Sequence, residues 1–314
     1  MSVLVTGGNG HIGSWISYLL ARKGKRVIIY DSNKNYPQYL LQELKEQLIF
    51  VHGDILDLPR LVTTFKKYEN DIEGIIHTIA IMGESVQINP YQNIKLNIIG
   101  LLNILETARI FRIKKVVYTS TGAVYGELPN MAHENQNLKP SDLYGATKIA
   151  SELLGEQYRK NFGIDFRVGR LYFVYGPGKY PSEFTNLYKI TFGLLEGLEG
   201  LVIERGGDQK LDFTYVEDAA MGIVLLYEQE NLKHQIFNIA SGRSEKISGV
   251  IKLARKYTHF PSDVKIGKGK LTKRCESLDI ELAKKELGYS PEYDLEKGIE
   301  IYSNWLKENP KRQY

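Results

Sequence analysis

The chain has 314 residues, 43% hydrophobic and 25% charged, which is typical of a folded globular protein of one or two domains and excludes a disordered or fibrous chain. Lysine and arginine (41) exceed aspartate and glutamate (37) by four, an excess too small and dispersed to indicate nucleic-acid binding. The longest apolar run, Ala219–Tyr227, is far shorter than the ~20 residues that span a bilayer, so we expect no membrane helix.

The N-terminus and the cysteine content indicate an intracellular, cytoplasmic protein. Residues 1–8 carry no basic segment, and glycines interrupt the apolar stretch before the core of a signal peptide could form. Cys275 is the only cysteine, which excludes an internal disulfide and a multi-cysteine metal site, and we expect no bound metal.

The first half of the chain alternates short β-branched runs with longer amphipathic ones, which is the pattern of βαβ units around a parallel sheet. The short runs are apolar on both faces, as buried parallel strands are. We expect strands at Ser2–Thr6, Arg26–Tyr30, Leu48–Val51, Gly74–His77, Lys115–Thr119 and Phe166–Leu171. We expect helices at His11–Lys23, Leu58–Lys67, Tyr91–Phe111 and Asp142–Asn161.

After Leu171 the sequence becomes rich in glycine, proline and tyrosine, and it predicts a smaller lobe over the carboxyl edge of the sheet. We expect helices there at Phe184–Leu195, Glu217–Glu228, Ile247–Tyr257, Asp279–Leu287 and Leu295–Lys307. We therefore assign residues 1–171 to the sheet domain, with further sheet elements near residues 212–240, and residues 172–314 mainly to a substrate-binding lobe.

A glycine-rich turn, Thr6-Gly-Gly-Asn-Gly-His-Ile-Gly13, joins the first strand to the first helix. Gly7 permits the tight turn, Gly10 lets the backbone approach a diphosphate, and Gly13 lets the helix pack closely on the strand. The N–H groups at the start of the helix then face an anion, so we expect a dinucleotide. A (β/α)₈ barrel does not call for this loop, and the sequence therefore predicts an α/β fold with a doubly wound parallel Rossmann sheet.

Acidic residues at the ends of the second and third strands refine the expected cofactor. Asp31 ends the second strand, where a carboxylate accepts hydrogen bonds from both ribose hydroxyls of an adenosine and repels a 2′-phosphate. We therefore expect NAD rather than NADP, and the alternative is that Asp31 is an ordinary turn residue. Asp54 and Ile55 follow the third strand and are expected near the adenine.

Tyr144 and Lys148 lie one helical turn apart on one face of an expected helix. A phenol with a pKa near ~10 is a poor base, but a lysine ammonium and an oxidised nicotinamide beside it both favour the phenolate. Only Tyr144 begins a long amphipathic helix that follows a strand ending in hydroxyl residues, so we expect Tyr144 to be the base. The same spacing also occurs at Tyr30/Lys34, Tyr175/Lys179 and Tyr293/Lys297.

Along nearly the whole chain, in order, the sequence resembles the extended short-chain dehydrogenases/reductases. The resemblance is to the NAD-dependent epimerase/dehydratase branch, which includes UDP-glucose 4-epimerase. The segments that carry it are the glycine loop, Asp31, Ser120–Gly126, Tyr144–Lys148, Arg170–Pro177, Asp212–Asp218 and Phe237–Gly242.

This resemblance implies roles for the residues at matching positions. Thr121 falls where the family keeps a hydroxyl that hydrogen-bonds the reacting oxygen, Tyr144 falls on the base, and Lys148 falls on the residue that orients the nicotinamide ribose. Asn97 matches an asparagine in the helix before the catalytic strand. The expected cofactor-binding residues are Gly7, Gly10, His11, Ile12, Gly13, Asp31, Asp54, Ile55, Ala80, Asn97 and Lys148.

Departures from the family pattern bear on the substrate. Gly122 and Ala123 replace the Asp-Glu pair with which dehydratases eliminate water, so we expect no dehydration. Phe173 and Leu211 replace an asparagine and an arginine that contact the nucleotide diphosphate. Either Lys210 or a basic cluster (Lys265, Lys268, Lys270, Lys273 and Arg274) holds the diphosphate, or the substrate has none. The expected substrate-binding residues are Thr121, Tyr144, Phe173, Lys210 and Leu211.

The resemblance implies NAD-dependent, reversible hydride transfer at a secondary hydroxyl of a sugar-type substrate, and the expected activity is nucleotide-sugar (UDP-sugar) 4-epimerisation. One alternative is an NAD-dependent dehydrogenase of a non-nucleotide sugar, sugar acid or other alcohol. A second is a catalytically silent NAD-binding scaffold or sensor, which the Thr121/Tyr144/Lys148 set argues against. Because the long helices Tyr91–Phe111 and Asp142–Asn161 typically pair across a dimer in this family, we also expect a homodimer.

Overall fold

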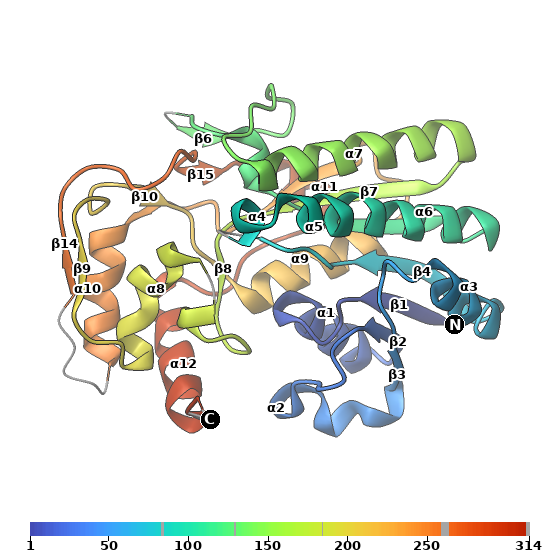
Figure 1. Cartoon of the computed structure of the whole chain (residues 1–314), viewed down its shortest axis with the longest axis horizontal. Coiled ribbons are helices and arrows are strands. Elements are labelled where there is room, and N and C mark those ends of the chain that lie inside the picture. Colours follow the sequence, from blue (N-terminus) through green and yellow to red (C-terminus); the bar gives the residue numbers. More distant parts are fainter. Residues whose placement is uncertain (83–84, 129, 184, 259–263, 312–314) are drawn as a thin grey trace.

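A seven-stranded parallel sheet forms the centre of the protein (Figure 1). The computed structural model describes residues 1–82, 85–128, 130–183, 185–258 and 264–311. The strand order is β12-β7-β5-β4-β1-β2-β3, and every neighbouring pair is parallel. The strands are β1 (Ser2–Thr6), β2 (Arg26–Asp31), β3 (Leu48–His52), β4 (Ile72–His77), β5 (Lys115–Thr121), β7 (Asp165–Leu171) and β12 (Ile236–Ile239).

Helices cover both faces of the sheet, and each face has its own apolar core. Helices α1 (His11–Arg22) and α9 (Val216–Glu228) pack side by side on one face. Helices α3 (Leu58–Lys67), α6 (Gly100–Ile110) and α7 (Leu143–Phe162) cover the other. A sheet buried on both sides explains why its strands read as continuous apolar runs, and the predicted doubly wound α/β fold is confirmed.

The direction of winding reverses at β1, which lies between β2 and β4. From β1 the chain builds β2 and β3 on one side, and it then returns to place β4 and β5 on the other. At such a switch point the loops that follow the two central strands diverge, which opens a crevice at their carboxyl ends. The glycine loop after β1 therefore lies at the mouth of this crevice.

The helix predicted over Tyr91–Phe111 is divided into three segments. It consists of α5 (Pro90–Ile94), a π-helical turn labelled η2 (Lys95–Ile99) and α6. The amide of Asn97, in the π turn, bonds both backbone groups of Ile81, at 3.0 and 3.2 Å. Single π turns of this kind recur at functional sites, and the sequence periodicity does not reveal this one.

The C-terminal part of the chain forms a second mass beside the carboxyl edge of the sheet (Figure 1). Helices α8 (Asn186–Phe192), α10 (Ile247–Tyr257) and α12 (Leu295–Glu308) enclose a third, aromatic-rich core. Helix α10 has the predicted bounds, and α8 is shorter than predicted, with residue 184 outside the described residues. The remaining helices are α2 (Gln38–Leu41), η1 (Gln42–Gln47), α4 (Ser85–Ile88), η3 (Gly122–Tyr125), η4 (Pro181–Glu183), η5 (Gly193–Glu196) and α11 (Glu281–Leu287).

None of the helices in the described part of the chain combines the length and apolarity that a bilayer-spanning segment needs.

Within the described residues, four two-stranded pairs connect loops outside the central sheet. The pairs are β8 (Val174–Tyr175) with β11 (Thr214–Tyr215), β9 (Leu201–Ile203) with β14 (Val264–Ile266), β10 (Lys210–Leu211) with β13 (Glu245–Lys246), and β6 (Met131–Ala132) with β15 (Ser277–Leu278).

Candidate active site

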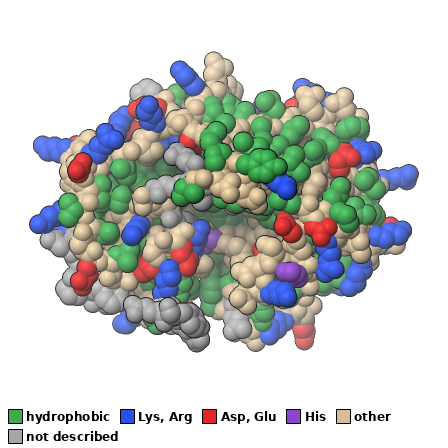
Figure 2. Space-filling view, in the orientation of Figure 1, with side chains coloured by type: hydrophobic (Ala, Val, Ile, Leu, Met, Phe, Trp, Pro, Cys, Tyr) green, Lys and Arg blue, Asp and Glu red, His purple; other side chains and the backbone are tan. Residues whose placement is uncertain are grey.

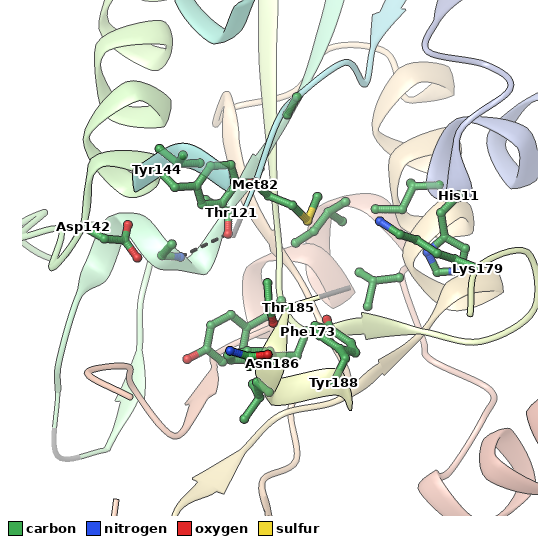
Figure 3. A pocket seen from close by; sticks show the side chains of 18 of the residues that line it. His11, Met82, Thr121, Asp142, Tyr144, Phe173, Lys179, Thr185, Asn186 and Tyr188 are labelled. Atoms are coloured by element: carbon green, nitrogen blue, oxygen red, sulfur yellow. Dashed lines mark hydrogen bonds between the residues drawn. The ribbon is translucent and has the colours of Figure 1, made fainter. Parts of the chain in front are cut away.

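A cavity of about 1150 Å³ lies at the carboxyl edge of the sheet and extends into the C-terminal part of the chain. Figure 3 shows His11 and Lys179 at one end of it and Thr121 and Tyr144 at the other. The cavity is lined by most of the residues that the sequence predicts to bind the cofactor or substrate or to act in catalysis: Gly7, Gly10, His11, Ile12, Gly13, Asp31, Ala80, Thr121, Tyr144, Lys148 and Phe173.

The glycine loop has the geometry that a dinucleotide diphosphate needs. Gly7 has φ of +75°, and a Cβ atom on Gly13 would lie 2.1 Å from the carbonyl oxygen of Gly7, so only glycine fits there. Gly10 precedes α1 and supplies no side-chain cap, which leaves the first N–H groups of the helix to an anion. The residues present therefore fit the diphosphate of NAD.

His11, the first residue of α1, is an uncharged part of this wall. Its Nε2 lies 3.2 Å from the carbonyl oxygen of Gly176. Burial lowers the pKa of His11 to about 3, and the charge of Lys179 lowers it further in the same direction. The histidine is thus neutral at physiological pH and contributes packing rather than charge.

Asp31 joins the glycine loop to the end of β2. Its carboxylate accepts hydrogen bonds from the backbone N–H of Asn9 at 3.0 Å and of Asn33 at 2.8 Å. These bonds fix the carboxylate of Asp31, the last residue of β2, at the wall of the cavity. A carboxylate in this place can accept hydrogen bonds from a ribose diol and repels a phosphate.

Thr121, Tyr144 and Lys148 come together because β5 ends beside the start of α7. Asp142 caps α7 by accepting a hydrogen bond from Gly145 N–H at 2.8 Å, which places Tyr144 in the first turn. Burial raises the pKa of the Tyr144 phenol, and the neighbouring Thr121 hydroxyl lowers it. Both side chains line the cavity, and Figure 3 shows them beside each other, so both hydroxyls can face one oxygen of a bound molecule.

Lys148 lies one turn after Tyr144 in α7 and also lines the cavity. Its Nζ donates to the carbonyl oxygen of Thr119 at 2.8 Å and lies 5.9 Å from the centre of the Tyr144 ring. Burial lowers the pKa of Lys148 to about 7, while the charge of Glu152 raises it. A cation at this position favours the phenolate form of Tyr144.

Five tyrosines have a lysine four residues later, because Tyr91 and Lys95 also have this spacing, and among the described residues only Tyr144 of the five lines the cavity. The hydroxyl of Tyr30 donates to the carbonyl oxygen of Asp54, and that of Tyr293 donates to Glu217. Tyr175 is buried and stacks on Phe192 with ring centres 4.9 Å apart. Tyr91 is exposed at the surface, so of the five tyrosines with this spacing the cavity selects Tyr144.

A buried polar network supports the catalytic strand and helix from behind. Glu152 of α7 accepts a hydrogen bond from Ser120 of β5 at 2.5 Å and forms a two-point ion pair with Arg170 of β7, at 2.7 and 3.2 Å. Arg170 also donates to Tyr125 at 2.7 Å, and Tyr125 donates to Asn238 at 2.7 Å. The network joins β5, α7, β7 and β12 directly beside Thr121.

Three of the predicted cofactor residues lie outside the lining of the cavity. Asp54 accepts a hydrogen bond from the N–H of Leu56 just beyond β3, and Ile55 is buried in the core beneath α6. Asn97 is also buried, where it holds the backbone of Ile81 and bonds the Thr147 hydroxyl at 3.1 Å. Direct contact between these three and the cofactor stays a prediction.

The structure does not bring Lys210 and Leu211 to the cavity. Leu211 is fully buried among aromatic side chains, because an apolar residue in β10 packs into the third core. Lys210 is exposed, with Nζ 3.9 Å from the carboxylate of Glu276. Of the basic cluster predicted as the alternative, Arg274 lines the cavity and Lys265, Lys268, Lys270 and Lys273 do not.

Phe173 does line the cavity, and its backbone is strained. Its φ is +32°, a left-handed conformation that residues other than glycine and asparagine rarely adopt and that costs ~1–3 kcal/mol. The ring packs against Tyr172, Tyr188 and Phe213, with centres 4.6 to 6.2 Å away. Such strain is kept where the surroundings hold the residue, here at the wall of the cavity.

Sequence reasoning missed the basic groups Lys179, Lys189 and Arg205, which all line the cavity. Lys189 and Arg205 come from the C-terminal part, as does Arg274, which bonds Ser141 at 2.6 Å and the carboxylate of Asp142. The sequence carried no motif for Lys189 or Arg205. Lys179 follows Gly-Pro-Gly, a turn whose direction the sequence does not reveal.

A glycine loop at the switch point of a parallel sheet, with a hydroxyl, a phenol and a lysine beside it, defines an enzyme that uses a nicotinamide dinucleotide. The chain belongs to the NAD-dependent epimerase/dehydratase family, whose sequence profile matches residues 3–240, and NAD is its cofactor.

Known relatives extend the match over the whole chain. It is 33% identical to the UDP-glucuronate 4-epimerase of Thermodesulfobacterium geofontis, covering 98% of this chain and 96% of that protein. The crystal structure of Thermotoga maritima UDP-glucose 4-epimerase with UDP-glucose has a TM-score of 0.87 and 28% identity, covering 99% of this chain and 100% of that one. The Bacillus cereus UDP-glucuronic acid 4-epimerase in complex with NAD has a TM-score of 0.82 and 30% identity, with the same coverage.

Proposed function

We propose that the protein is a UDP-sugar 4-epimerase. The observation that carries this proposal is that a single cavity is lined by the glycine loop, by Tyr144 and by three basic side chains from the C-terminal part of the chain, Lys189, Arg205 and Arg274. Its volume of about 1150 Å³ exceeds the ~300–1000 Å³ of ordinary small-molecule sites, in keeping with a cofactor and a nucleotide substrate bound together. The relatives named above act on UDP-sugars.

In the proposed reaction the phenolate of Tyr144 takes the proton of the sugar hydroxyl, and Thr121 donates a hydrogen bond to the same oxygen. Bound NAD supplies a nicotinamide that accepts the hydride from the carbinol carbon and returns it. The ammonium of Lys148 stabilises the phenolate. Once the keto sugar has turned over in the cavity, Tyr144 would return the proton to the same oxygen, which completes inversion at that carbon.

The substrate diphosphate is best matched by Arg205 and Arg274. Guanidinium groups form strong, two-point hydrogen bonds with phosphates, and both arginines line the cavity from the C-terminal part of the chain. Phe173 offers no donor from its side chain. The diphosphate would therefore be held from the C-terminal part of the chain and not through positions 173 and 211.

We also propose that the enzyme does not dehydrate its substrate. Ala123, two residues after Thr121, lines the cavity, and its methyl group cannot transfer a proton. A Cβ atom on Gly122 would lie 2.4 Å from the ring of Tyr172, so that position has no room for an acidic side chain.

The direct test is incubation of the purified protein with UDP-glucose, UDP-galactose, UDP-glucuronate and the corresponding free sugars. Both NADH absorbance and the sugar products are followed. We expect an isomerised UDP-sugar without accumulation of NADH. Stoichiometric NADH would instead identify the dehydrogenase, for which the loss of donors at Phe173 and Leu211 argues. Failure of every UDP-sugar to bind would eliminate the nucleotide-sugar proposal.

A prediction on the cofactor rests on Asp31. We expect NAD to bind much more tightly than NADP, and Asp31→Ala to reduce this preference by roughly tenfold or more, because a hydrogen bond to a charged group contributes ~1.5–3 kcal/mol and the repulsion of the 2′-phosphate is removed. Calorimetric titration with both cofactors measures the ratio. Equal affinities in the unmodified protein would contradict the role of Asp31.

We propose further that two copies form a dimer through α4, α5 and α7. Figure 2 shows hydrophobic side chains gathered over these helices. Ile88, Tyr91 and Leu153 are 83%, 75% and 61% exposed, which is unusual for large apolar residues that lie together on one face. Sedimentation velocity should show a dimer, and Leu153→Glu should convert it to monomer. A monomeric unmodified protein at micromolar concentration would disprove the interface.

A further inference from the structure

Within the part of the chain that the structure describes, the sheet side of the cavity presents no side-chain cation at the glycine loop. Among the described residues up to position 86 that line the cavity, Asp31 is the only carboxylate, and none is lysine or arginine. His11 is neutral, because its pKa is lowered to about 3. On this side a diphosphate carrying two negative charges would meet the N–H groups of α1 but, among these lining residues, no side-chain cation.

Lys179 reaches the same end from the opposite wall. It follows a turn that is bound to α1, because Trp15 Nε1 donates to the carbonyl oxygen of Pro177 at 3.1 Å and His11 Nε2 lies 3.2 Å from that of Gly176. Figure 3 shows the side chains of Lys179 and His11 beside each other, at the end of the cavity away from Tyr144. The effect of Lys179 on the pKa of His11 agrees with this proximity.

Two further contacts fix the turn before Lys179, and they therefore fix the position of Lys179 itself. Gly178 has φ of +106°, and a Cβ atom on it would lie 2.3 Å from the hydroxyl oxygen of Tyr39. The hydroxyl of Tyr302 donates to the backbone carbonyl of Lys179 at 2.6 Å. Burial lowers the pKa of Lys179, and an adjacent anion would stabilise its charged form.

We propose that Lys179 is a cofactor-binding residue whose ammonium group contacts the diphosphate of NAD, opposite the N-terminus of α1. The cofactor diphosphate would then be held between two walls, by backbone N–H groups on the sheet side and by one cation from the loop after β8. The proposal does not depend on the identity of the sugar substrate.

The test compares ADP-ribose, which contains the diphosphate, with adenosine, which does not. By calorimetry, Lys179→Gln should weaken ADP-ribose binding roughly 10- to 100-fold, the usual effect of losing a charge-assisted hydrogen bond, and leave the weak binding of adenosine unchanged. Lys179→Arg should restore much of the affinity. The matched control is Lys311→Gln, which removes a lysine that contacts Ser182 and Glu183 just after the same turn but does not line the cavity.

Three results would overturn the proposal. The first is unchanged ADP-ribose affinity in Lys179→Gln. The second is an equal loss for adenosine, which would mean that the variant distorts the whole site. The third is a loss confined to UDP-glucose, which would assign Lys179 to the substrate. Because ADP-ribose binding requires no turnover, failure here is distinguishable from failure of the proposed epimerase activity.

Discussion

Replacement of Tyr144 by phenylalanine is expected to lower kcat by roughly 10²–10⁴-fold and to leave the affinity for NAD nearly unchanged. The ring keeps its packing in the first turn of α7, but the oxygen that would take the proton from the sugar hydroxyl is gone. Tyr144 lines the cavity, where Thr121 lies beside it (Figure 3). The measurements are the rate of epimerisation at saturating UDP-sugar and NAD binding by calorimetry.

The chain supplies a matched control in Tyr175, which also precedes a lysine by four residues. Tyr175 is buried in the aromatic core, outside the lining of the cavity, so Tyr175→Phe should turn over at close to the rate of the unmodified enzyme. Thr121→Val should slow the reaction by less than Tyr144→Phe, since it removes a hydrogen bond but not the base. If Tyr144→Phe kept its activity and Tyr175→Phe lost it, the assignment of the base would be wrong.

Replacement of Arg170 by methionine is expected to lower the free energy of unfolding by about 3–5 kcal/mol. The carboxylate of Glu152 would then stay buried with a hydroxyl from Ser120 but without its counter-charge. The side chains of the pair are only 2% and 5% exposed, so water cannot replace the guanidinium. Chemical denaturation followed by fluorescence and circular dichroism measures the loss.

The surface ion pair between Glu156 and Arg159 lies on α7, the helix that also carries Glu152, and it serves as a control for the effect of burial. Arg159 bonds Glu156 through two contacts of 2.7 and 2.8 Å, with side chains about one-third exposed, and Arg159→Met should cost less than ~1 kcal/mol. The double variant Arg170→Met/Glu152→Met should recover most of the stability, because no unpaired charge remains. A loss for Arg170→Met no larger than for Arg159→Met would show that the buried network does not stabilise the fold.

Regular elements were predictable where local chemistry sets their ends. Helix α3 has the predicted bounds, since Asp57 caps it by accepting a hydrogen bond from Arg60 N–H and Pro59 follows the cap. The first strands were predicted to within two residues because burial on both faces leaves continuous apolar runs. The π turn at Lys95–Ile99 was not predictable, since it depends on the contact of Asn97 with Ile81, sixteen residues earlier.

The sequence by itself determined the parallel sheet, the glycine loop and the Tyr144–Lys148 pair, because each depends on short-range spacing, backbone sterics or one turn of helix. The tertiary structure alone decided which side chains share the cavity. Tyr175 and Lys179 have the same spacing as Tyr144 and Lys148, but they flank a turn and not a helix, so the tyrosine enters the aromatic core while the lysine reaches the glycine loop. Leu211 packs into the third core because its side chain is apolar, whereas the basic residue Arg205 lines the cavity. The turn before Lys179 bonds α1 across more than 160 residues of chain, and no local pattern in the sequence records a contact of this kind.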